Sequence, residues 1–224
     1  MKIDTMRRAI RLVGLVLPMT WMPRSALGQM RVAANAESYG VAVSTPTVNQ
    51  KTPYAVLPAG GDMAQDQGQS VAVPGLVTAA DLFAIATGDA DESYGSNAVS
   101  SATLGAVSLL NGLISADGIV AIASSTIGGG LTGSDAEGSS VANLVVNGTS
   151  VADPAPNTRM DLPGVGYAIL NEQTLTGDGV SSSGITVNMI HVVLQEPILG
   201  LLGQVIGYQT VGNIIVGSAT SSVQ

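Results

Sequence analysis

The chain has 224 residues, of which 46% are hydrophobic and 11% charged, with a formal net charge of −8 and no cysteine. Without cysteine, neither a disulfide framework nor lipid attachment at a leader cysteine is possible. The acidic balance makes nucleic acid and anionic membranes poor partners, because no basic patch exists to displace counterions from phosphates.

The first 28 residues have the pattern of a signal peptide. An uncharged apolar run at 12–22 follows four basic residues, Lys2, Arg7, Arg8 and Arg11. Ala26-Leu27-Gly28 then gives a small-x-small cleavage site. The apolar run is too short to span a bilayer, which needs about 20 residues. We therefore expect residues 1–28 to be removed and residues 29–224 to form a single secreted domain, with general secretory and twin-arginine export both open.

Removal of that leader makes the chain more acidic. Three basic residues, Arg31, Lys51 and Arg159, then stand against 15 acidic ones, a formal charge of −12. The C-terminal end has no apolar tail or basic cluster, so we expect no transmembrane anchor in the mature chain. The chain is predicted to be secreted from a bacterium and to be extracellular or associated with the cell surface.

The mature composition predicts an all-β domain, because Gly, Ser, Thr, Val and Ala dominate and no long segment has helical periodicity. Polar loops are expected at 57–68 and 127–140. Asn111-Gly112 predicts a hairpin turn, with a kink in one strand as the alternative. The architecture is predicted to be a two-sheet antiparallel β-sandwich, with a β-solenoid as the alternative. Strands are expected at 37–45, 69–73, 81–87, two within 104–125, and 141–148, 158–162, 165–170, 184–194 and 213–223.

The Leu-Pro-Gly at 162–164 lacks the threonine of a wall-sorting signal, so it is interpreted as a turn. Proline fixes φ and glycine supplies a positive φ, which suits a type II turn. A two-residue turn at Pro163-Gly164 predicts that Leu162 faces Val165 and that Met160 faces Tyr167.

Five phrases carry a family resemblance: LLNGLISADGI, NLVVNGT, PNTRMDLPGVGYAILNEQ, ITVNMIHVVL and GNIIVGSATSSV. In this order they resemble the bacterial choice-of-anchor P domain, over roughly Glu37 to Val223 and most closely after Leu104. The resemblance implies an extracytoplasmic, surface-associated protein with no active-site residues to carry over. The chain departs from the family in having no recognisable anchor.

No catalytic residue is predicted. His191 is the only histidine, and strict alternation places it on one strand face with Ile185, Val187, Met189 and Val193. That setting is typical of a hydrogen-bonded structural histidine, and no Gly-x-Ser-x-Gly elbow supports a serine triad. We therefore expect a protein that is not an enzyme.

No cofactor is predicted either, although calcium is kept as an alternative. Asp89, Asp91 and Glu92 share one predicted loop, and oxygen-rich loops bind calcium. Their spacing lacks the full calcium-loop pattern, so a plain solvated acidic loop is the main interpretation. One histidine and no cysteine leave too few ligands for zinc.

The segment 196–212 is the predicted interaction site. Helical spacing of its apolar residues, with Pro197 in a first-turn position, predicts a short helix or apolar hairpin that plugs one end of the core. The alternative is an exposed patch for self-association or attachment to a cell-surface component. The candidate residues are Ile198, Leu199, Leu201, Leu202, Val205, Ile206 and Tyr208.

These features favour a non-enzymatic, extracellular structural or adhesive protein. The alternative function is a secreted carbohydrate-binding or carbohydrate-acting module. Such a module would use an exposed aromatic platform, for which the mature chain offers five tyrosines and Phe83.

Overall fold

A computed structural model describes residues 33–91 and 94–224; the predicted signal peptide lies outside them. All regular structure in the described residues is β-strand, in sixteen strands. They are β1 (Ala34–Ser44), β2 (Asn49–Val56), β3 (Asp62–Val73), β4 (Val77–Asp91), β5 (Gly95–Leu104), β6 (Val107–Leu109), β7 (Ile114–Ala116), β8 (Gly118–Gly128), β9 (Leu131–Asp135), β10 (Ser140–Ala142), β11 (Leu144–Val146), β12 (Thr149–Val151), β13 (Thr158–Leu162), β14 (Gly166–Gly177), β15 (Ser183–Leu199) and β16 (Val205–Val223).

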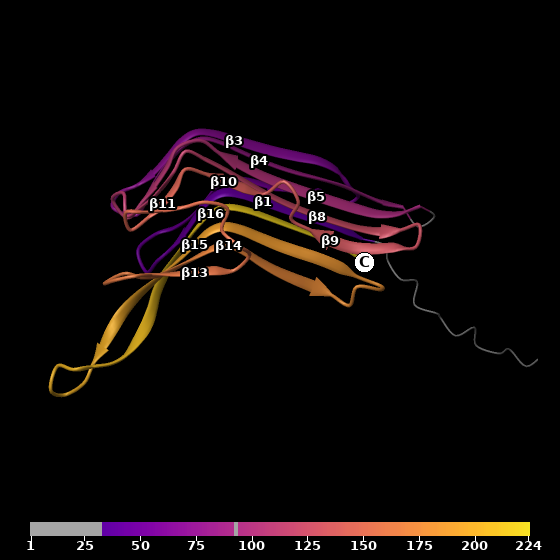
Figure 1. The fold of residues 1–224 in the computed structure, drawn as a ribbon. Coiled ribbons are helices and arrows are strands. Elements are labelled where there is room, and N and C mark those ends of the chain that lie inside the picture. The colour runs from indigo at the N-terminus through magenta and orange to yellow at the C-terminus, as the bar shows by residue number, and fades with distance from the viewer. Residues whose placement is uncertain (1–32, 92–93) are drawn as a thin grey trace, which may run out of the picture. The chain divides into compact units, whose positions relative to one another are not determined.

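The strands form two antiparallel sheets that face each other (Figure 1). The six-stranded sheet has the order β13-β14-β15-β16-β1-β2. In the ten-stranded sheet the main order is β10-β8-β5-β4-β6-β7-β11-β12, while β3 pairs with β4 and β9 with β8. The predicted all-β class and two-sheet sandwich are confirmed. The β-solenoid alternative is wrong, because the strands pair with antiparallel neighbours instead of stacking as parallel rungs.

The two sheets enclose one large apolar core and a second, smaller one. The large core is built from aliphatic side chains of both sheets, such as Leu109, Ile114, Ile190 and Ile214, all fully buried. The smaller core is mostly alanine, and its members are Ala36, Ala55, Leu57, Ala84, Ala86, Ala98 and Val223. Small side chains allow the sheets to approach more closely there than large aliphatic ones do.

Serine hydroxyls join the sheets directly beside the alanine-rich core. Ser38 Oγ donates to the carbonyl of Ile85 at 2.9 Å, and Ser100 Oγ donates to the carbonyl of Thr220 at 2.8 Å. Buried Ser125 bonds Ser221 at 2.7 Å across the sandwich. Because each hydroxyl has a partner, these polar groups are buried without an unsatisfied donor.

Alternation in the six-stranded sheet reverses along one line that crosses five strands. Pairing skips Gly40, Pro53, Asn171, Met189 and Gly217, which lie side by side in β1, β2, β14, β15 and β16. On β15, the residues that point to the core are Ile185, Val187 and Met189 up to this line, and Ile190 and Val192 after it. The prediction that His191 shares a face with Ile185, Val187 and Met189 is therefore wrong, and only Val193 of the four predicted residues lies on its face. His191 lies on the outer face.

Both predicted polar loops are largely strand. Residues 62–68 belong to β3, and 131–135 form β9, because each segment pairs with an apolar neighbour, β4 or β8. The hairpin turn at Asn111-Gly112 is confirmed: Leu109 pairs with Ile114 across it, and both turn residues have positive φ.

The turn at Pro163-Gly164 is present, but the predicted register is wrong by one residue. The Val165 N–H donates to the Leu162 carbonyl at 3.0 Å, and Gly164 has φ +76, as in a type II turn. Leu162 pairs with Gly166 rather than Val165. A type II turn splays ordinary hairpin strands, so a third loop residue is needed before pairing resumes.

Candidate functional site

The last two strands continue beyond the rest of the six-stranded sheet as a projecting hairpin, defined here as residues 195–211. β14 stops pairing with β15 at Leu194, and β1 stops pairing with β16 at Asn213. The two strands still pair with each other out to Leu199 and Val205. Figure 1 shows this hairpin as the yellow and orange ribbon that extends away from both sheets.

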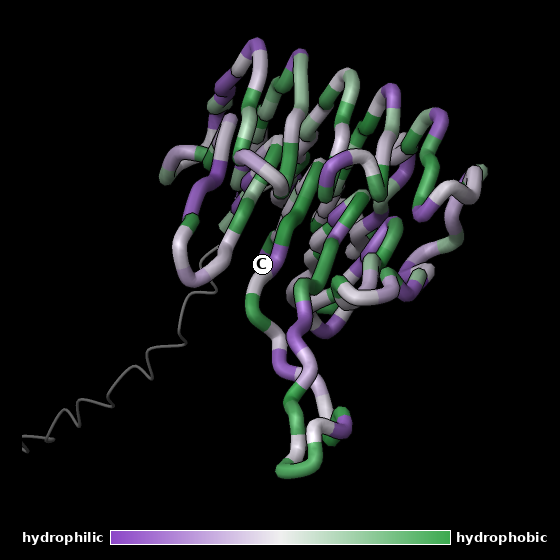
Figure 2. Tube along the Cα trace, turned by 90° about the vertical axis from the view of Figure 1, so that its left-hand side faces the viewer, coloured by the Kyte–Doolittle hydropathy of each residue, from purple (hydrophilic) through white to green (hydrophobic). Residues whose placement is uncertain are grey.

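All seven predicted interaction residues lie on the projecting hairpin and are exposed. Leu201 and Leu202 at the tip are 105% and 92% exposed, and Ile206 and Tyr208 are more than 60% exposed. In Figure 2 the end of the hairpin is coloured as hydrophobic. No charged residue occurs from Pro197 onward in the sequence. The tip is therefore an uncharged apolar surface in water.

The prediction that this segment forms a helix or plugs the core is wrong; only the hairpin form is confirmed. Residues 195–199 and 205–211 are strands, and none of the seven side chains joins either core. The apparent helical spacing has a different cause: a tight turn at 200–204 places Leu201 and Leu202 together at the tip.

Three backbone donors of this tip turn are paired within the turn. The Gly200 N–H donates to the Gln204 carbonyl at 2.8 Å, and the Gly203 N–H donates to the Gly200 carbonyl at 2.9 Å. The Gln204 side chain folds across the turn and accepts from the Leu202 N–H at 3.1 Å. A Cβ at Gly200 would lie 2.6 Å from Gln204 Nε2, so glycine allows this closure. The turn can meet an apolar partner with these donors already paired.

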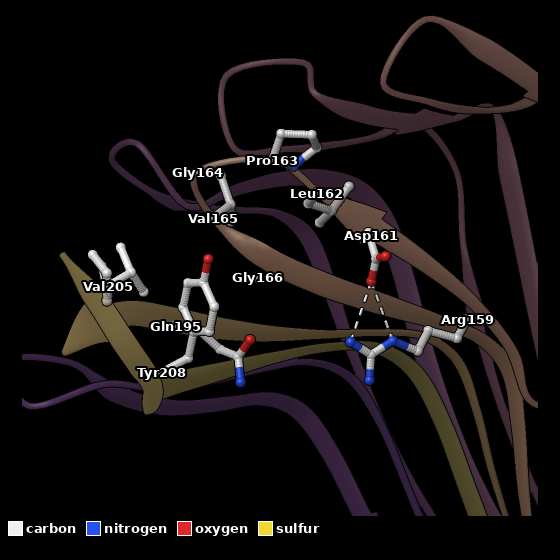
Figure 3. Close-up of a pocket in the computed structure, with 11 residues that line it drawn as sticks. Arg159, Asp161, Leu162, Pro163, Gly164, Val165, Gly166, Gln195, Val205 and Tyr208 are labelled. Carbon is white, nitrogen blue, oxygen red and sulfur yellow. Dashed lines mark hydrogen bonds and ion pairs between the residues drawn. The ribbon is translucent and has the colours of Figure 1, made fainter. Parts of the chain in front are cut away.

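A pocket of about 490 Å³ lies between the side of the hairpin and the turn 162–166 (Figure 3). Val205 and Tyr208 form one wall, and the Leu162–Gly166 turn forms the other. The Gln195 N–H donates to the Val165 carbonyl at 2.7 Å and ties the two walls together. Sequence reasoning missed this pocket because its walls are about 30 residues apart in the chain and meet only through sheet pairing.

The outer face of the six-stranded sheet carries a polar band centred on His191. His191 Nδ1 lies 3.0 Å from Glu172 Oε2, and Nε2 lies 3.1 Å from Asn213 Oδ1. Asn188 donates to the same Glu172 oxygen at 2.6 Å and accepts from Ser218 Oγ at 2.7 Å. Both ring nitrogens of His191 thus have partners, which indicates a structural role.

The His191–Glu172 pair shifts both pKa values. The hydrogen bond to Glu172 raises the pKa of His191 above its ordinary value of 6.5, although burial opposes this. The same bond lowers the pKa of Glu172 below 4.5, again against burial. Each charged form therefore stabilises the other in the folded protein.

Stability is expected to depend on pH through this pair. Because the folded pKa of His191 is raised, its contribution is complete below pH 6.5 and is lost as pH rises through the folded value. Because that of Glu172 is lowered, its contribution is present above pH 4.5 and is lost on acidification. We therefore expect the free energy of unfolding of the wild type, measured from pH 4 to 9, to decline above pH 6.5. His191→Gln should remove this decline. An unchanged profile would contradict this assignment.

The remaining cationic side chains in the described part lie on the same face. Lys51 pairs with Glu37 at 2.9 Å and lies over the ring of Tyr39 at 4.5 Å and that of Tyr54 at 4.6 Å. Arg159 lies over the ring of Tyr167 at 3.7 Å. This outer band was not predicted, because its members are scattered over six strands.

Comparison with known proteins gives no relative. No protein-family model, curated protein or solved structure matches this chain.

Two of the three acidic residues considered for calcium lie in a strand instead of a loop. Asp89 and Asp91 belong to the end of β4, and Asp91 accepts from the Tyr94 N–H at 3.0 Å. Glu92 lies outside the described residues. Within 33–91 and 94–224, no three potential metal-ligating carboxylate or imidazole groups come together. None of the elements described in these ranges is a helix of the length and hydropathy needed to cross a membrane.

Proposed function

We propose that this protein is a non-enzymatic, extracellular, surface-associated protein that acts by contact through its projecting hairpin. The observation that carries the proposal is the exposure of seven apolar side chains on an extension of the sheet that has no charged residue beyond Glu196. Large exposed apolar patches on soluble domains typically mark interaction sites. The signal-peptide pattern and the resemblance to the choice-of-anchor P domain support an extracellular location.

The arrangement of the polar residues supports a contact function over a chemical one. Lys51, His191 and Arg159, the side chains most suited to acid-base or electrostatic chemistry, are each paired with a carboxylate on the sheet. His191 uses both ring nitrogens in hydrogen bonds. A catalytic base is expected to keep one such position for substrate.

The double substitution Leu201→Ser/Leu202→Ser tests the proposed function. We expect the free energy of unfolding to change by less than about 0.5 kcal/mol, because both side chains are in water. The fraction retained on producing cells should fall at least tenfold, because the apolar contact is lost. Cell fractionation with immunodetection measures retention, and thermal unfolding measures stability.

The matched control is Leu175→Ser/Val180→Ser, since these residues are 70% and 78% exposed at another place in the fold. This control should retain the wild-type distribution. Equal retention of the tip variant and the wild type would refute a contact role for the hairpin.

The second candidate function is carbohydrate binding, and the outer band favours it. Sugar-binding surfaces combine aromatic rings with hydrogen-bonding side chains, and Tyr39, Tyr54 and Tyr167 lie on this face beside Lys51 and Arg159. Tyr54 is 41% exposed, whereas Tyr39 is 9% exposed and offers little ring surface. Glycan-array binding that is lost in Tyr54→Ala but kept in the tip variant would favour this candidate over the hairpin.

A further inference from the structure

We propose that the projecting hairpin pairs with the hairpin of a second copy of this chain, β16 against β16, to form a four-stranded antiparallel ribbon. This inference rests on the proposed contact function, since it names the partner that the hairpin contacts. Two-fold symmetry is the simplest arrangement, because the same surface is used by both copies.

The need for a strand partner follows from the free edges of the hairpin. Over Glu196–Leu199, β15 has no strand neighbour on the side that β14 occupies elsewhere, and over 205–211, β16 lacks β1. Backbone N–H and C=O groups along such edges readily pair with another chain. An isolated two-stranded ribbon is at best marginally stable in water, whereas a four-stranded one is not so limited.

The free edges favour a polypeptide partner over a lipid bilayer. In the tip turn, the N–H groups of Gly200, Leu202 and Gly203 are paired within the turn. The strands behind it have open edges, and a bilayer core offers no partner for an open sheet edge, where each unsatisfied group costs several kcal/mol. A second copy supplies both the backbone partners and an apolar surface.

The two edges of the hairpin differ in their protection. The β15 edge carries Glu196 and Pro197, and both a charge and a proline discourage strand addition. The β16 edge, VIGYQTV at 205–211, carries neither. The unprotected edge is therefore the one assigned to pairing.

Pairing along β16 leaves the pocket of about 490 Å³ outside the contact. Its wall at 162–166 lies on the β14 side of the hairpin, whereas the second copy joins on the side that β1 occupies elsewhere. The hairpin alone, residues 195–211, supplies fewer residues than the about 20–30 per side of a stable interface, so we expect the dimer to be weak and to depend on concentration.

The first test is the mass of the purified full chain in solution, measured by analytical ultracentrifugation across a concentration series. We expect a dimer whose dissociation constant rises at least tenfold in Ile206→Lys, because a lysine on the pairing edge brings two like charges together. Leu175→Lys, an equally exposed apolar position at the far end of β14, should dimerise as the wild type does. Thermal unfolding of both variants checks that they fold.

The second test uses the absence of native cysteine. Single cysteines placed in turn at Ile206, Gly207, Tyr208, Gln209 and Thr210 should form disulfide-linked dimers at one position or at two neighbours. Only residues facing each other at the two-fold axis bring their Cα atoms within the 4.4–6.8 Å that a disulfide requires. Leu175→Cys should not cross-link under the same conditions.

The outcomes separate this inference from the proposed function. A monomer at all concentrations, or cross-linking spread evenly over 206–210, overturns β16 pairing. Co-sedimentation of the monomer with phosphatidylcholine vesicles would do so too, while leaving the hairpin as the contact element. If Leu201→Ser/Leu202→Ser leaves cell retention intact but the dimer forms, the inference holds and the surface-contact function fails.

Discussion

Gly166→Ala is expected to lower the free energy of unfolding by about 3 kcal/mol or more, because strain and a steric clash act together. Gly166 has φ +138, a backbone conformation in which L side chains are strained. A Cβ at this position would also lie 2.0 Å from the carbonyl oxygen of Val193 on β15. That oxygen belongs to a paired strand and has no room to move. Urea unfolding of the variant measures the loss.

Gly164→Ala is the matched control in the same turn. Gly164 also has a positive φ, +76, but no atom lies within 4 Å of its Cβ position. Only the conformational penalty remains, which is about 1–2 kcal/mol. If the two variants lose the same stability, the close approach of the turn to β15 is not the reason why position 166 requires glycine. Loss of the pocket wall should accompany Gly166→Ala alone.

The strands that the sequence predicted most accurately have apolar alternation and a clear turn beside them. The segments at 158–162, 165–170, 184–194 and 213–223 contain many β-branched residues and were predicted as strands. Residues 62–68 were missed because DMAQDQG is mostly polar and lacks apolar alternation, and a strand on a sheet edge needs no apolar face. Its pairing with β4 is a long-range effect that local composition does not encode.

The faces of the strands were harder to predict than their existence. Period-two counting holds only while every residue is extended and paired. At Gly217, with φ +64, and Asn171, with φ +48, the chain leaves that conformation, and alternation reverses. The sequence offers one signal, since Gly217 interrupts the run IIVGSA. No local sequence signal marks Met189, whose pairing is skipped because it lies between Asn171 and Gly217 on the two neighbouring strands.

The residues of the candidate site were predicted, while its form (helix or hairpin) and its exposure (plug or patch) each had two alternatives. A mostly apolar, glycine-containing segment indicates exposure as readily as burial, and only its place beyond the ends of β14 and β1 decides between them. The pocket and the polar band arise from pairing between distant strands. Their members, such as Arg159 and Tyr167 or His191 and Glu172, have no shared local pattern.

Because alternation reverses, truncation of Ile190 is expected to lower the free energy of unfolding strongly, although strict period-two counting would place this residue on the outer face of the sheet. Ile190 is fully buried in the large core, next to Met189 in the chain. Ile190→Ala is expected to lower the free energy of unfolding by about 2–5 kcal/mol through lost burial and the cavity left behind.

Ile215→Ala is the matched control. Ile215 on β16 pairs with His191 on β15, and it is only partly buried on the outer side. Its truncation removes less apolar surface from the folded state, so a loss below about 1.5 kcal/mol is expected. Chemical unfolding compares the two variants directly. The opposite order would mean that the strands keep strict alternation through Met189 and Gly217, and the polar band would then have to face the core. That placement would leave Glu172 and His191 buried among aliphatic side chains, where an ion pair is rarely stable.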